Sequence, residues 1–99
     1  MWIFLPESFI SVVQKPGDTD MLTVRARIQG DIESVFPEAH VEADKGTDYK
    51  YRARLSRQTV AQVLQDQVMG LHWGNFKGAV KDRKRHDAYM KVWRAMYAV

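Results

Sequence analysis

The chain has 99 residues, of which 45% are hydrophobic and 27% are charged, and it contains no cysteine. This length suits one small domain, residues 1–99, and the composition excludes a largely disordered chain. The lack of cysteine excludes disulfides, thiolate catalysis and iron–sulfur clusters, and no apolar run is long enough to span a membrane. We expect a cytoplasmic protein, because a chain without cysteine fits a reducing compartment.

The charges are distributed unevenly along the chain, although the formal net charge is only +3. Residues 1–48 contain four Lys/Arg and nine Asp/Glu, whereas residues 49–99 contain eleven Lys/Arg and three Asp/Glu. Such a split indicates a positive face on an otherwise acidic molecule. Solvated surface charges without a ligand are an equally good interpretation.

Segments rich in aromatic and β-branched residues, or alternating with period two, predict strands. The first two flank the turn residues Pro6-Glu7-Ser8, so we predict a hairpin whose first strand begins the mature fold and is not a signal peptide. The predicted strands are Trp2–Leu5, Phe9–Gln14, Leu22–Ile28, His40–Ala43 and Tyr49–Leu55. A loop is expected at residues 44–48.

Apolar residues at helical spacing and capping residues predict helices, mostly in the second half. They are Ile32–Phe36, a helix capped by Ser56 that runs to Val68, Asn75–Arg83 and His86–Ala98. The last carries the clearest apolar stripe, predicted to face the core: Tyr89, Val92, Trp93, Met96 and Tyr97. We therefore predict an α+β fold, with an antiparallel sheet of about five strands, helices on one face, a partly ferredoxin-like order and a helical C-terminal third.

Cations occupy the outward side of two predicted strands. They are Arg25, Arg27, Lys50, Arg52 and Arg54. If these strands lie close together, five cations share one face, and the planar fork of arginine binds phosphate or carboxylate in a bidentate manner. Structural ion pairs are an equally good interpretation, with Asp18, Asp20, Glu42 or Asp44 as cross-strand partners. Tyr49 and Tyr51 alternate with these cations, so their rings are expected on the opposite face.

A second basic cluster follows in the C-terminal third. Lys77, Lys81 and Lys84 would share one helix face, and we expect Lys77, Lys81 and Arg85 to assist in binding phosphate. Trp73 and Phe76 lie in and beside a connection flanked by glycines, where an exposed apolar patch would bind a protein partner.

Catalytic and metal-binding patterns are weak in this sequence. The three histidines lack a partner at i+4, and neither standard glycine-rich phosphate loop occurs. We therefore expect no enzymatic activity, no metal and no cofactor. A small acylphosphatase-like hydrolase using Arg25 and Asn75 is a less favoured alternative.

Several segments, in this order along the chain, resemble a family of small, uncharacterised bacterial and phage proteins. The segments are residues 2–4, 8–13, 24–27, 48–53, 75–77 and 88–93. The resemblance implies a self-contained cytoplasmic domain without catalytic residues to carry over. The phage members imply an inhibitor or ligand sponge that acts against host defence.

Two function classes follow from these observations. The favoured one is a non-enzymatic protein that binds a phosphate-bearing ligand, a nucleotide or nucleic acid, through the cations named above. The alternative is a protein-interaction module that inhibits a partner protein. A homodimer through the edge strand Trp2–Leu5 stays open, because an unpaired strand edge can pair across a two-fold axis.

Overall fold

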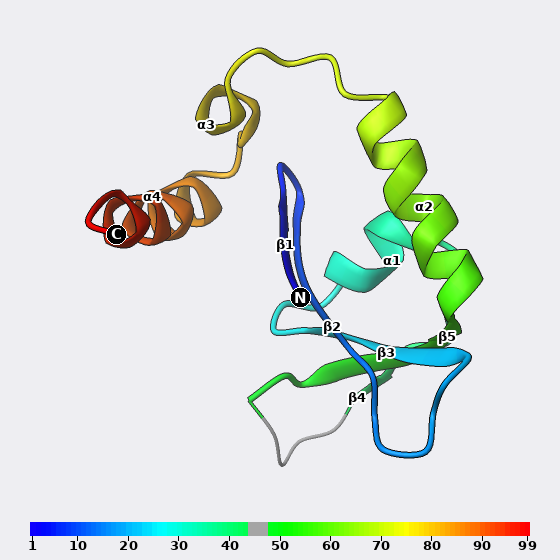
Figure 1. Ribbon diagram of the computed structural model, residues 1–99. Helices are drawn as coiled ribbons and strands as arrows, with labels where there is room; N and C mark the ends of the chain where they lie inside the picture. Colours follow the sequence, from blue (N-terminus) through cyan, green and yellow to red (C-terminus); the bar gives the residue numbers. More distant parts are fainter. Residues whose placement is uncertain (44–47) are drawn as a thin grey trace.

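The computed structural model describes residues 1–43 and 48–99. Most of the predicted loop at residues 44–48, including the alternative ion partner Asp44, lies outside the described residues. The elements are β1 (Trp2–Leu5), β2 (Ser8–Val13), β3 (Met21–Ala26), α1 (Asp31–Val35), β4 (Glu42–Ala43), β5 (Tyr51–Ser56), α2 (Arg57–Met69), α3 (Phe76–Ala79) and α4 (Arg83–Tyr97) (Figure 1).

The strands form one antiparallel sheet in the order β1-β2-β3-β5-β4. The predicted α+β class with a five-stranded antiparallel sheet is confirmed. Strands β3 and β4 run parallel with β5 inserted between them, which is the split β-α-β arrangement of ferredoxin-like folds. A ferredoxin-like fold has a last strand that pairs with the other edge of β3. In this protein β2 of the N-terminal hairpin occupies that position.

One face of the sheet carries the core, because alternate side chains of a strand point the same way. Its buried residues include Ile10, Val24 and Ala53, which pack with Ile32 of α1 and Val60 of α2. Figure 1 shows α1 and α2 together on this side of the hairpin. We call the other side, which carries Trp2, Ser11, Arg25 and Arg52, the open face. Helix α4 contacts it at the hairpin.

Local sequence explains where α1 and α2 begin. Gly30 precedes α1 with a φ of 93°, a left-handed conformation that favours glycine. The Ser56 hydroxyl accepts a hydrogen bond from the backbone N–H of Thr59 at 3.0 Å, as predicted for the N-cap of α2. Helical spacing predicts Val68 on the core side of α2 with Val60, but Val68 is 68% exposed in the last turn of the helix.

Helix α3 is shorter than predicted, because the backbone becomes extended at Val80. The side chain of Asp82 then caps α4, accepting a hydrogen bond from the N–H of Arg85 at 2.9 Å. The prediction that Lys77, Lys81 and Lys84 share one helix face is therefore wrong. Lys77 lies on α3, Lys81 in the connection, and Lys84 on α4.

The prediction that the whole α4 stripe faces the core is also wrong. Tyr89 is half-buried against the hairpin, on the side opposite α1 and α2, whereas the remaining four stripe residues are exposed. Their exposed fractions are 39% for Val92, 57% for Trp93, 61% for Met96 and 79% for Tyr97. In the described part of the chain, none of the helices could cross a membrane.

Candidate ligand-binding site

A row of residues crosses the open face, one from each strand. In sheet order they are Trp2, Ser11, Arg25, Arg52 and Glu42, each opposite the next in the strand pairing. Neighbouring strands lie about 4.8 Å apart, so the row spans about 19 Å. It joins an aromatic ring at the β1 edge to two cations in the middle of the sheet. The sequence could not show this, because the row depends on strand order.

Arg25 and Arg52 face each other at the centre of this row. The Nη2 of Arg25 donates to the Oγ of Ser11 at 2.7 Å, and its guanidinium lies 4.4 Å from the centre of the Tyr49 ring. The Nε atoms of Arg25 and Arg52 are buried and have no hydrogen-bond partner among the described residues. Within the same residues, no ion pair joins either arginine to a carboxylate. Glu42, opposite Arg52 on the edge strand, lies instead 3.9 Å from the Nε2 of His40.

Tyr49 does not lie where the alternation placed it. Strand β5 begins only at Tyr51, so the period-two pattern does not extend to residue 49. The Tyr49 ring therefore reaches the guanidinium of Arg25, and the expectation that this ring and the cations lie on opposite faces is wrong. Tyr51, inside the strand, packs against the core as expected.

Arg54 forms the structural ion pair that the sequence left as an alternative. Its Nη2 lies 2.7 Å from the Oδ1 of Asp18, and its Nε donates to Oδ2 at 3.1 Å. The hydrogen bond from Arg54 lowers the pKa of the Asp18 carboxyl. Arg54 is thus already bound to a carboxylate of the protein itself.

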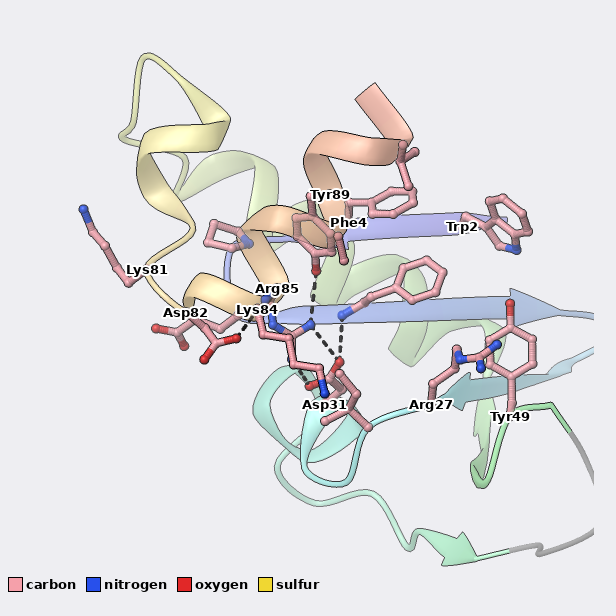
Figure 2. A pocket seen from close by; sticks show the side chains of 16 residues that line it. Trp2, Phe4, Arg27, Asp31, Tyr49, Lys81, Asp82, Lys84, Arg85 and Tyr89 are labelled. Carbon is pink, nitrogen blue, oxygen red and sulfur yellow. Dashed lines mark hydrogen bonds and ion pairs between the residues drawn. The ribbon is translucent and has the colours of Figure 1, made fainter. Parts of the chain in front are cut away.

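A groove of about 950 Å³ lies between the hairpin, α4 and the segment after β3 (Figure 2). The rings of Trp2, Phe4 and Phe9 line it on the sheet side. Arg27 and Tyr49 stand with Trp2 at one end, as Figure 2 shows. The charged residues at the other end are Lys81, Asp82, Lys84 and the paired Asp31 and Arg85. The groove combines an apolar floor with charged residues of both signs, because Glu7 and Asp82 line it together with Arg27, Lys81 and Lys84.

Six aromatic rings form a continuous chain through this region. In order of contact they are Trp2, Phe9, Phe4, Tyr89, Phe76 and Trp73. Consecutive ring centres are 4.7–6.3 Å apart, within the range of favourable aromatic pairs. Trp73 and Phe76 are half-buried in this chain, so they help to attach α3 and α4 to the hairpin.

Arg85 forms a buried ion pair with Asp31. The Arg85 side chain is 10% exposed and the Asp31 side chain is 5% exposed. Arg85 donates from Nη2 to Oδ1 at 2.7 Å and from Nη1 to Oδ2 at 3.0 Å, and the N–H of Phe9 also donates to Oδ2 at 3.0 Å. Burial lowers the pKa of Arg85, but its hydrogen bonds to Asp31 and Tyr89 outweigh burial and raise it. Arg85 therefore anchors α4 beside the groove.

The Tyr89 hydroxyl joins the same network. It lies within donating distance of the carbonyl oxygens of Leu5, at 3.0 Å, and Ser8, at 2.9 Å. It also accepts a hydrogen bond from Nη1 of Arg85 at 3.2 Å. Burial raises the pKa of Tyr89, and the opposing effect of Arg85 is smaller.

This raised pKa predicts a loss of stability at high pH. The unfolded chain releases the Tyr89 proton near pH 10 while the folded chain retains it, so the free energy of unfolding falls as the pH rises above 10. Tyr89→Phe loses about 1 kcal/mol of hydrogen bonding at neutral pH. The variant has no hydroxyl at this position to release a proton, so its stability does not fall for this reason above pH 10. We expect the two urea-unfolding curves to converge above pH 10. A constant difference between them would contradict the assignment.

The remaining predicted residues are spread around the site. Arg27 and Lys81 line the groove, and Lys81 donates to the carbonyl of Gly78 at 2.9 Å. Lys50 and Lys77 are exposed, before β5 and on α3 respectively. Asn75 caps α3 by accepting from the N–H of Lys77 at 3.0 Å, whereas Arg25 contacts Ser11 and Tyr49 across the sheet. These contacts place the two hydrolase candidates in separate environments.

Sequence reasoning missed Trp2, Phe4, Phe9 and Lys84 as groove residues, and Asp31 as the partner of Arg85. Alternation within the hairpin does place Trp2 and Phe4 on one face. Which face that is depends on the pairing of Ser11 with Arg25. The pairing of Asp31 with Arg85 has no signal in the sequence, because the two residues lie 54 positions apart.

Comparisons of the chain with protein-family models, with curated proteins and with solved structures find no match. Across residues 1–43 and 48–99, no cluster of three or more His, Cys, Asp or Glu residues could hold a metal ion.

Proposed function

We propose that this is a non-enzymatic protein that binds a phosphate-bearing ligand, a nucleotide or a nucleic acid, on the open face of its sheet and in the adjoining groove. The observation that carries this proposal is the facing pair Arg25 and Arg52, without a carboxylate partner among the described residues, beside an aromatic groove. A role as a phage-type sponge or inhibitor of host defence is compatible with such binding, because sequestering a ligand needs no catalytic residue.

The arginine pair has the chemistry for a phosphate group. Like charges on directly opposed strand positions repel, and an anion between them would turn that repulsion into attraction. Each guanidinium offers a planar fork that matches two phosphate oxygens. The buried Nε atoms of Arg25 and Arg52 have no partner among the described residues, which costs about 1–3 kcal/mol each, and a phosphate that reached them would remove this cost.

The aromatic end of the row has the chemistry for a base. Trp2 is 67% exposed, and it contacts Phe9 edge to face. Stacking of one base on an exposed ring contributes about 1–3 kcal/mol and tolerates any base. Trp2 and Arg25 are two strands apart, about 10 Å, so one ligand can stack on Trp2 and present phosphate to the arginines. Arg27, at the same end of the groove, adds a further cation.

Fluorescence anisotropy tests the proposal with labelled single- and double-stranded DNA and RNA and with a labelled nucleoside triphosphate. The logarithm of affinity should fall linearly with the logarithm of salt concentration. Two phosphates neutralised by Arg25 and Arg52 on a single strand predict a slope of about −1.4 or steeper. If none of these probes binds at low salt, or if binding ignores salt, the proposal is wrong.

A second candidate function, binding of a protein, is favoured by a different surface. The sequence placed this function at Trp73 and Phe76, but both are half-buried in the aromatic chain. The exposed apolar residues of α4 are the better candidates, because large exposed apolar patches mark interaction surfaces.

A further inference from the structure

Helix α4 presents four apolar side chains that the described part of the chain leaves largely uncovered. Val92, Trp93, Met96 and Tyr97, here called the α4 stripe, are between 39% and 79% exposed. The rings of Trp93 and Tyr97 stack on each other, with centres 5.3 Å apart. The two rings therefore form one apolar cluster at the end of the helix.

The two cations in the C-terminal half of α4, Lys91 and Arg94, lie away from this stripe, and the other cations of the helix lie in its first turn. A helix turns about 100° per residue, which places Lys91 about 170° and Arg94 about 130° from the middle of the stripe. Two copies of α4 can therefore meet stripe to stripe without opposing their lysines and arginines. An anionic membrane surface, by contrast, is best bound when cations flank the apolar face.

A hollow beside the stripe offers a receptor for a large side chain. It has a volume of about 440 Å³, lies between α3 and α4, and is lined by Phe76, Val80, Met90 and Trp93. Tyr97, one helical turn beyond Trp93 and 79% exposed, is a side chain suited to such a hollow. The same face thus carries both a projecting ring and a hollow, which is what an isologous contact between identical chains requires.

We infer that the α4 stripe is the interface of a homodimer in which two α4 helices pack antiparallel about a two-fold axis. A covered Trp or Tyr side chain buries about 150–250 Å². Four such rings, with the valines and methionines, bring the buried area to roughly the 1,000 Å² that a specific interface needs. Val92 also lines the aromatic groove, so the stripe adjoins the proposed ligand site, but the inference does not rest on the proposed ligand. It differs from pairing through the edge strand β1.

Sedimentation velocity of the full chain, over a wide range of protein concentrations, measures the oligomeric state. We expect a particle of twice the chain mass that dissociates on dilution. Met96→Glu introduces a charge into the stripe and should give the monomer, whereas Lys91→Glu on the back of the same helix should leave the dimer intact. A chain that stays monomeric throughout overturns the inference, and so does equal dissociation of both variants.

Crosslinking provides a second test that does not depend on affinity. The chain contains no cysteine, so a single introduced cysteine reports only on its own surroundings. Under mild oxidation, Met96→Cys should form a disulfide-linked dimer, because an antiparallel pair brings the two stripes together. Lys91→Cys serves as the matched control. If both variants crosslink equally, or if only Lys91→Cys does, the stripe is not the interface.

Discussion

Asp31→Ala is expected to lower the free energy of unfolding by about 3–5 kcal/mol, which is a large effect for a single substitution. The change leaves the guanidinium of Arg85 buried without its partner and removes the acceptor of the Phe9 N–H. Domains of this size are stable by about 5–15 kcal/mol, so a substantial fraction of the stability would be lost. Urea unfolding followed by circular dichroism measures the change.

Two controls separate the ion pair from a general effect of losing a carboxylate. Asp18→Ala breaks the exposed pair with Arg54 and should change stability far less, because water screens that interaction. The double variant Asp31→Leu, Arg85→Met replaces the buried charges by apolar groups and should recover much of the loss. If Asp31→Ala and Asp18→Ala cost the same, the buried pair does not have the importance assigned to it.

Arg25→Ala and Arg52→Ala should each weaken binding of single-stranded DNA by about 10- to 100-fold. This follows from the 1.5–3 kcal/mol that a hydrogen bond to a charged group contributes. Each substitution should also make the salt dependence shallower, because one phosphate fewer is neutralised. Arg52→Ala should not lower the melting temperature much, since removing one of two opposed like charges relieves repulsion, whereas Arg25→Ala also removes the hydrogen bond to Ser11 and the contact with Tyr49. Anisotropy titrations at several salt concentrations measure both the affinity and its salt dependence.

Arg54→Ala is the matched control for these two variants. Arg54 lies on the same face of β5 as Arg52, two residues further along, but it is bound to Asp18. Its removal should change affinity only slightly. If Arg54→Ala weakens binding as much as Arg25→Ala does, the face attracts phosphate only through its overall charge, and the central arginine pair is not the site.

The buried pair and the proposed ligand site are physically connected through α4. Arg85 attaches the first half of α4 to Asp31 of α1, and Tyr89 attaches it to the hairpin. The same helix forms one wall of the groove. A variant that breaks the pair should therefore affect the groove as well as stability. Variants at Arg25 and Arg52 act on the open face without touching this attachment.

The sequence by itself determined most of the elements and, within the strands, which side chains share a face. Period-two alternation in Leu22–Ile28 placed Val24 towards the core and Arg25 on the outer face, as observed. The hydroxyl of Ser56 marked the start of α2. These are local properties, because backbone geometry alone sets which side chains of a strand share a face and which residue caps a helix.

Tertiary structure decided which residues meet. The pairing of β1 with β2 and of β2 with β3 put Trp2 in line with Arg25, and folding brought Asp31 to Arg85. Helical periodicity predicted an apolar stripe on α4, but only Tyr89 meets the hairpin and the rest is exposed. The period of a pattern shows that a face favours burial, whereas the surface that covers it depends on residues far away in the chain.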